Sequence, residues 1–140
     1  MFIDANLLMA DTLTTTTSGA STSYIDSTTA SIKLNDAYAG PAFWYVKTEA
    51  AFAGGAACTA EFQLQTSNDS AFLDSTTITV ATSGALLTAA LTANTFVAKK
   101  KLPLGMKRYT RTYMVVGGTG VFTTASWSAG IAMDVPNLLP

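Results

Sequence analysis

Apolar and polar residues alternate with a period of two along much of the chain, and no stretch sustains a helical period. The clearest alternation spans residues 58–66, where the apolar positions are Cys58, Ala60, Phe62 and Leu64. Because successive side chains of a β-strand point to opposite faces, this stretch predicts a strand with one buried face. Residues 76–82 predict another strand, with Ile78 and Val80 pointing inward.

The last third of the chain predicts three strands, over residues 95–102, 107–116 and 126–133. The first of these stops at Pro103, which cannot donate a hydrogen bond to a neighbouring strand, so we expect it to end as an edge strand does. A glycine-rich turn at residues 117–120 connects the other two, because glycine adopts turn conformations at little steric cost.

The first half of the chain predicts shorter strands separated by polar turns. These strands fall at residues 12–17, 21–25, 30–34 and 43–48, and the last of them is expected to face packed side chains on both sides. Residues 85–93 are rich in Leu and Ala and predict one or two helical turns.

We therefore expect an all-β fold, a jelly-roll β-sandwich of about eight strands, because short strands with long irregular connections are typical of that architecture. Residues 1–11 mix apolar and acidic side chains and are too short for an independent helix, so they predict an extended N-terminal arm. Residues 12–140 would then form a single jelly-roll domain.

Charge limits the range of partners. Only 12% of the 140 residues are charged, and 8 basic and 9 acidic residues leave a net charge of −1. Such a chain has no overall field that would attract nucleic acid or an anionic membrane. The first 11 residues also lack the pattern of a signal peptide, and no window offers the roughly 18 apolar residues of a spanning helix. We expect no direct contact with nucleic acid or membrane.

Most catalytic chemistry is excluded by residue type. The chain has no histidine and one cysteine, Cys58, so histidine-based triads, histidine-bearing zinc sites and an intrachain disulfide are absent. We expect Cys58 to be a small buried apolar residue. The carboxylates of Asp69, Asp74, Glu49 and Glu61 are scattered, and the sequence neither supports nor excludes a glycosidase pair among them. We predict no cofactor and no metal, and an enzyme is the weakest candidate.

Two features stand out as candidate contact sites. Six of the eight basic residues fall in one short segment: Lys99, Lys100, Lys101, Lys107, Arg108 and Arg111. They indicate either lysine-protected strand edges or a patch that meets an acidic protein surface. The apolar residues of the arm, Phe2, Ile3, Leu7 and Leu8, indicate either packing into the chain's own core or docking on a partner.

Three segments resemble the capsid cement, or decoration, proteins of tailed double-stranded DNA bacteriophages. They are FIDANLLMAD at 2–11, AEFQLQTSND at 60–69 and LPLGMKRYTRTYMVVGGTGVFTTASWSAGIAMDVP at 102–136. The most specific part is the pattern G-x-K-R-Y-x-R-x-Y-x-V-V at residues 105–116. The chain departs from the family in residues 12–31, which are mostly Ser and Thr.

The resemblance implies a jelly-roll protein on the outer surface of the capsid in the virion, assembled in the cytoplasm of a bacterial host. It implies binding to the major capsid protein, bridging of neighbouring subunits, and a homo-oligomer, a dimer being favoured over a trimer. Phe2, Ile3, Leu7, Leu8, Lys99, Lys100, Lys101, Lys107 and Arg108 would be the contact residues. The alternative is a carbohydrate-binding jelly-roll adhesin of a phage tail or surface, which would need exposed aromatic side chains on a concave face.

Overall fold

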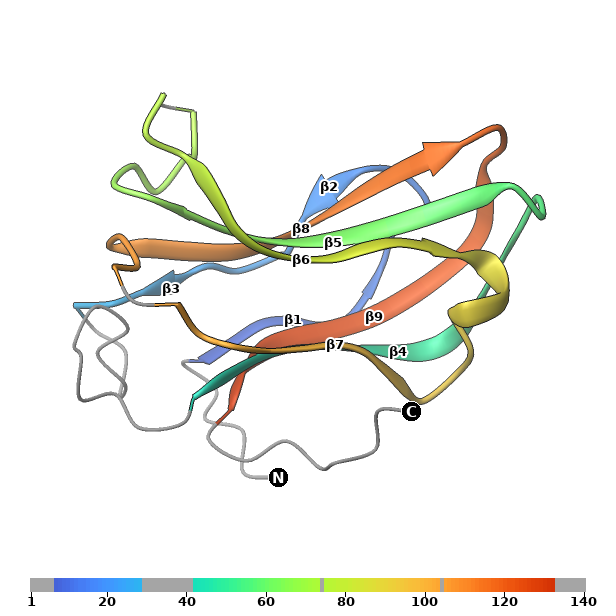
Figure 1. Cartoon of the computed structure of the whole chain (residues 1–140), viewed down its shortest axis with the longest axis horizontal. Coiled ribbons are helices and arrows are strands. Elements are labelled where there is room, and N and C mark those ends of the chain that lie inside the picture. Colours follow the sequence, from blue (N-terminus) through green and yellow to red (C-terminus); the bar gives the residue numbers. More distant parts are fainter. Residues whose placement is uncertain (1–6, 29–41, 74, 104, 133–140) are drawn as a thin grey trace.

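The computed structural model describes residues 7–28, 42–73, 75–103 and 105–132, and these form two antiparallel β-sheets packed face to face (Figure 1). The predicted all-β sandwich is thereby confirmed. The strands are β1 (Leu8–Thr14), β2 (Gly19–Ala20), β3 (Ile25–Asp26), β4 (Phe43–Gly54), β5 (Cys58–Ser67), β6 (Ile78–Leu87), β7 (Thr95–Lys101), β8 (Tyr109–Gly118) and β9 (Phe122–Ala132), and a short 3-10 helix, η2 (Thr88–Ala90), follows β6.

The order of strands in the sheets is that of a jelly roll. Sheet A has the order β1-β9-β4-β7, and sheet B has the order β2-β8-β5-β6, with β3 also pairing with β8. The chain passes between the sheets at most of its connections, and this winding closes an eight-stranded jelly roll. Because β2 and β3 contain two residues each and both pair with β8, they act as one interrupted strand. The expected number of about eight strands is met in this sense.

The hydrophobic core lies between the sheets and is built from the inward positions of the alternating strands. In β5 the inward residues Cys58, Phe62 and Leu64 are fully buried, which confirms the strand predicted at 58–66. The ring of Phe62 meets the ring of Trp127 on β9 edge to face at 5.3 Å between centroids, so that aromatic side chains join the two sheets. Cys58 is free and buried, as predicted.

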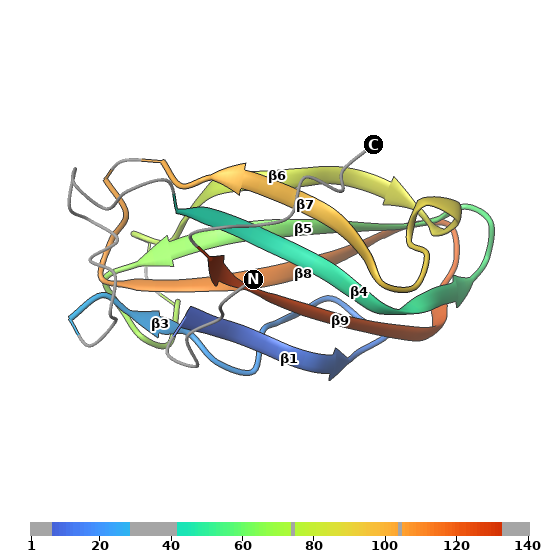
Figure 2. The same cartoon turned by 90° about the horizontal axis from the view of Figure 1, so that it is seen from below.

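The edges of the two sheets lie along the two long sides of the sandwich (Figure 2). Strands β6 and β7 form one side, and β1 and β3 lie along the other. Among the described strands, β7 pairs with β4 alone and ends at Lys101, shortly before Pro103, which confirms the predicted edge.

The N-terminal boundary of the fold differs from the prediction. Residues 1–6 of the predicted arm lie outside the described residues, but Leu8–Asp11 belong to β1, and Leu7, Met9 and Ala10 are buried in the core. The arm therefore does not extend to residue 11. The reason is that β1 pairs with β9 through two register shifts, and these irregularities hide the alternation that marks a strand.

Several other predicted elements have different bounds in the structure. The strand expected at 76–82 is β6, which continues to Leu87. Ile78 lies opposite the buried Thr66, on the core side as predicted, but it is 45% exposed because it begins an edge strand. Of the helical turns expected at 85–93, only η2 forms. The strand expected at 21–25 is reduced to β3, and the one expected at 30–34 lies outside the described residues.

Candidate functional site

The lysines of the predicted basic cluster that precede Pro103 lie on the edge of sheet A. Lys100 and Lys101 are exposed, and Lys99 Nζ lies 5.3 Å from the centroid of the Phe43 ring on the neighbouring strand. Lysines on an edge strand oppose the addition of a further strand, because pairing would bury their charge. This position favours edge protection as the role of these three residues.

The residues of the cluster that follow Pro103 lie at the start of β8 in sheet B and have partners within the chain. Lys107 donates its backbone N–H to Thr66 Oγ1 at 2.8 Å and its Nζ to the carbonyl of Thr76. Arg108 donates from Nε and Nη2 to the two carboxylate oxygens of Asp26 at 3.1 and 3.0 Å. The structure thus divides the basic cluster between the two sheets.

The Arg108–Asp26 pair ties the short strand β3 to β8. The hydrogen bonds from the Arg108 side chain, followed by that from the backbone N–H of Thr28, hold the pKa of Asp26 well below its usual value. Arg108 also lies over the ring of Tyr109, 4.8 Å from its centroid. Because the guanidinium group is already held by a bidentate pair, Arg108 has a structural role in the edge of sheet B.

Of the four apolar residues predicted as contacts in the arm, the structure describes Leu7 and Leu8. Phe2 and Ile3 lie outside the described residues. Leu7 is 3% exposed and belongs to the core, so it cannot serve as a surface contact. Leu8 is half-buried in β1, opposite Gly130 of β9.

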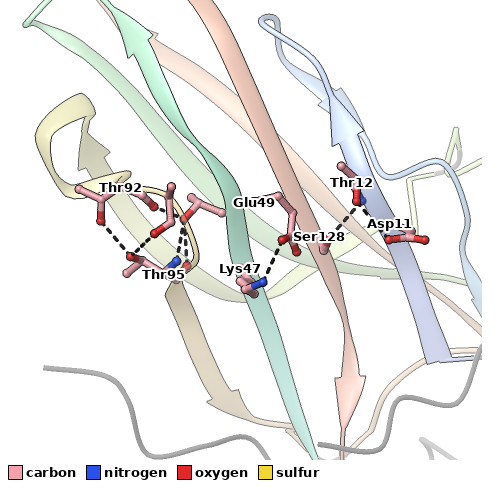
Figure 3. A network of polar contacts seen from close by, with 9 residues as sticks. Asp11, Thr12, Lys47, Glu49, Thr92, Thr95 and Ser128 are labelled. Atoms are coloured by element: carbon pink, nitrogen blue, oxygen red, sulfur yellow. Dashed lines mark hydrogen bonds and ion pairs between the residues drawn. The ribbon is translucent and has the colours of Figure 1, made fainter.

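The outer face of sheet A carries a set of polar contacts (Figure 3). Lys47 Nζ lies 2.8 Å from Glu49 Oε2, and the backbone N–H of Thr12 donates to Ser128 Oγ at 3.0 Å. Burial acts to raise the pKa of Glu49, but the hydrogen bonds from Lys47 and Ser128 outweigh it, and the pKa is lower than usual. Lys47 and Glu49 therefore neutralise each other on this face.

Tyr45 forms the apolar part of the same face. Its ring packs against Phe96 and crosses Gly130, where a Cβ atom would lie 3.0 Å from Tyr45 Oη. Burial, with the negative charges of Glu49 and Asp11, raises the pKa of Tyr45 to about 12. Tyr45 Oη is buried without a hydrogen-bond partner in the described part of the chain, so the side chain is held by packing alone.

The outer face of sheet B carries a row of hydrogen-bonded side chains along β5. Gln63 Nε2 donates to Glu61 Oε1 at 3.2 Å, and Gln65 Nε2 donates to Gln63 Oε1 at 3.2 Å. Arg111 Nε on β8 then donates to Gln65 Oε1 at 3.0 Å. The row fixes the position of the Arg111 side chain at its end.

Aromatic rings enclose the guanidinium group of Arg111. It lies 4.2 Å from the ring centroid of Phe72 and 5.3 Å from that of Tyr113. Burial lowers the pKa of Arg111, although the charge of Tyr113 opposes this effect. Tyr24 extends the aromatic group, with its ring centroid 5.3 Å from that of Tyr109 and 6.5 Å from that of Phe72.

The loop that joins β5 to β6 contains a highly exposed leucine, Leu73. In Figure 1 this loop rises beyond sheet B at the upper left. The carboxylate of Asp69 accepts a hydrogen bond from the backbone N–H of Ala71 at 3.1 Å and another from that of Leu73 at 3.3 Å. Phe72 has a positive φ of 55°, and its ring packs against Arg111 on the outer face of sheet B. Leu73 is left 87% exposed.

We call the group of Tyr24, Leu73 and Arg111 the Leu73 patch, because Phe72, next to Leu73 in the chain, packs on both Tyr24 and Arg111. Tyr24 is 48% exposed, so the patch holds two of the five large apolar side chains that the described residues expose. Tyr24 and the pair Phe72–Leu73 are not among the contact residues that the sequence predicts. A signal existed, because two adjacent large apolar residues within the polar turn SNDSAFLDS have no place in an ordinary solvated loop.

The described residues offer no centre for metal chemistry. Among them no group of three or more Cys, Asp or Glu side chains is placed to hold a metal ion. Within the same ranges, no helix has the length and apolar character needed to cross a membrane. The surfaces of the two sheets and the loop at residues 68–77 are therefore the features on which a function can be argued.

A comparison with known protein families assigns the chain to one of them. No curated protein matches the sequence. The family model Bbp16 matches residues 9–131, which run from β1 to the end of β9 and so include the strands of both sheets. The chain therefore belongs to the Bbp16 family, a phage-associated family.

Proposed function

We propose that this protein is a structural component of a phage head, a cement or decoration protein that binds the outer surface of the mature capsid and bridges neighbouring capsid subunits. The observation that carries the proposal is the match to a phage-associated family over residues 9–131, which contains one of the three segments that resemble the cement proteins, 60–69, and most of a second, 102–136.

The chemistry of the described surfaces supports a binding role. Two ion pairs among the described residues are internal to the fold: Lys47–Glu49 lies within β4, and Arg108–Asp26 joins the start of β8 to β3. The outer face of sheet B presents rings, amides and one guanidinium group, a composition that is typical of protein interfaces. A rigid sandwich with such a face is suited to hold other subunits in place, and no catalytic step is part of the proposal.

The stabilising effect follows from mass action. A protein that binds the expanded mature shell but not the compact precursor stabilises the expanded state by RT ln(1 + [L]/Kd) at each site. At a concentration 100 times Kd this amounts to about 2.7 kcal/mol per site. A standard interface of about 1,200–2,000 Å² would be sufficient for such binding. Repeated over many sites, the gain opposes the pressure of the packaged DNA.

The partners in this proposal are the major capsid protein and further copies of the chain, as a dimer in preference to a trimer. The protein would be assembled in the cytoplasm of the bacterial host and would remain on the outside of the virion. Neither nucleic acid nor membrane is a partner, because the net charge of −1 provides no general attraction to either.

A second candidate function is carbohydrate binding by an adhesin of a phage tail or surface. The observation in its favour is the group of Tyr24, Tyr109 and Tyr113 on the outer face of sheet B, close to the amides of Gln63 and Gln65. Exposed aromatic rings beside amide groups can stack on sugars and bind their hydroxyl groups. A glycan array that showed specific binding would favour this function.

The experiment uses shells of the encoding phage that were assembled without this protein. Purified protein is mixed with expanded shells and, separately, with unexpanded precursor shells, and each mixture is followed by co-sedimentation and by thermal disruption. We expect saturable binding to expanded shells alone, together with a higher disruption temperature. Absence of binding to both shells would refute the proposal.

A further inference from the structure

We propose that the Leu73 patch is the surface by which this protein docks on a capsid subunit, and that the subunit offers an apolar pocket for Leu73 beside a carboxylate for Arg111. The inference rests on the proposed function and adds to it the contact surface and the chemistry of the partner. It places the contact at the end of the sandwich where residues 69–73 pack on Arg111 of β8 and on Tyr24, just before β3.

The first support is that the loop holds Leu73 in its exposed position. The Asp69 carboxylate accepts two backbone N–H groups of the loop, and the backbone N–H of Phe72 donates to the carbonyl of Asp69 at 3.1 Å. The Phe72 side chain is 7% exposed and anchors the loop on Arg111 and Tyr24. A side chain displayed on a preordered loop loses little conformational entropy on binding, which raises its contribution to affinity.

The second support is the state of Arg111. Its Nε is bonded to Gln65, but no described residue accepts a hydrogen bond from either of its Nη groups. The rings of Phe72 and Tyr113 hold the guanidinium plane, and the group is half-buried. A fixed guanidinium group with both Nη groups available is well suited to a bidentate contact with a carboxylate.

The charges of the patch favour a different protein over a second copy of this chain. The carboxylate of Asp69 is occupied by loop N–H groups, and that of Asp26 is paired with Arg108. A two-fold contact between identical patches would bring two Arg111 guanidinium groups into one interface, where their like charges repel, while the described carboxylates of Asp69 and Asp26 are already bonded within each chain. An acidic group on another protein supplies the missing charge.

The same features argue against nucleic acid as the partner. Binding to a phosphate backbone requires several cations along one surface. The patch contains one guanidinium group and two exposed apolar side chains, and buried interfaces between proteins are enriched in this combination of aromatic residues and arginine.

The test measures the binding of variants to expanded shells assembled without the protein. Leu73→Ser removes the exposed anchor from a site where the side chain packs little against its own chain, so the fold should be unaffected. Val121→Ser is the matched control, because Val121 is 71% exposed at the opposite end of the sandwich, in the turn between β8 and β9. We expect Leu73→Ser to raise Kd about 30-fold, as for an interface hot spot, and Val121→Ser to leave it unchanged.

A second variant tests the arginine separately. Arg111→Gln should raise Kd about 10-fold or more and make binding less sensitive to salt, because the charged contact with the partner is lost. Thermal unfolding of each variant verifies that the sandwich remains intact.

The outcomes distinguish this inference from the proposed function. If the wild-type protein binds expanded shells and Leu73→Ser binds equally well, the inference is wrong while the proposed function stands. If the wild-type protein does not bind, both are wrong. Sedimentation velocity of the free protein gives a third result: if Leu73→Ser converts an oligomer into a monomer, the patch joins copies of this chain, which overturns the assignment to a capsid subunit.

Discussion

Two buried threonines on one face of β8 should respond in opposite ways to the same substitution. Thr110 and Thr112 are both fully buried and both point into the core. Thr112 Oγ1 accepts the indole N–H of Trp44 at 3.0 Å, whereas Thr110 Oγ1 has no hydrogen-bond partner within the described ranges. Replacement by valine keeps the shape and the β-propensity of the side chain and removes only the hydroxyl group.

The expected effects follow from the state of each hydroxyl. Thr112→Val leaves the Trp44 N–H buried without an acceptor, which costs about 1–3 kcal/mol, and we expect the free energy of unfolding to fall by about 2 kcal/mol. Thr110→Val replaces an unpaired hydroxyl with a methyl group, and we expect the free energy of unfolding to be unchanged or to rise by up to about 1 kcal/mol.

The measurement is equilibrium unfolding in urea, followed by tryptophan fluorescence. Trp44 and Trp127 are both fully buried, so their emission reports the loss of the core. The slope m should be the same for the wild type and both variants, so that a shift in midpoint is a shift in stability. If both variants change stability by the same amount and in the same direction, the reasoning from hydrogen bonds is refuted. In a Trp44→Phe background, Thr112→Val should lose most of its cost.

Three further predictions concern glycine, acid and alkali. Gly118→Ala should destabilise by about 3 kcal/mol or more, because φ is +82° and a Cβ atom would lie 1.9 Å from the Ala57 carbonyl oxygen; Gly84→Ala, with φ +75° and no atom within 4 Å, should lose only about 1–2 kcal/mol in urea unfolding. Folding lowers the pKa of Asp26 below its ordinary value of 3.8, so the pair with Arg108 stabilises the protein above about pH 4, and this stabilisation is lost as the pH falls further. The variant Asp26→Asn should therefore lower the midpoint of thermal unfolding at pH 7 and have little effect on it in strong acid. Folding raises the pKa of Tyr45 from 10.0 to about 12, so the free energy of unfolding should fall as the pH rises from 10 to 12. The variant Tyr45→Phe should reduce this fall. If the variant loses as much stability in alkali as the wild type, the fall does not arise from Tyr45.

Regular strands near the centre of each sheet were the predictable part of the fold. In β5 every second residue faces the core, and the prediction for residues 58–66 is correct to within one residue at the C-terminal end. The sequence of β1 does not alternate in this way, because its pairing with β9 shifts register twice and Thr12 has a positive φ of 50°. A strand with such irregularities was interpreted as part of an arm.

The candidate site was less predictable, because sequence distance says little about which sheet a residue joins. Lys101 and Arg108 are seven positions apart, yet the connection between β7 and β8 carries the chain from sheet A to sheet B. Arg111 acquires its significance only from Phe72 and Gln65, which are distant in sequence and adjacent in space. The exposure of Leu73 likewise depends on a loop geometry that the composition of the turn does not specify.

The pairing of the first and last described strands determines how the protein responds to mechanical force. Strands β1 and β9 are antiparallel neighbours, and the start of β1 lies beside the end of β9, with Leu8 opposite Gly130. Tension applied between these two ends would therefore break the hydrogen bonds between β1 and β9 one after another, so that little force would separate the strands. Load applied through the faces of the sheets meets the packed core as a whole. A load-bearing protein with this fold should therefore be attached through the faces of its sheets and not through these two strand ends.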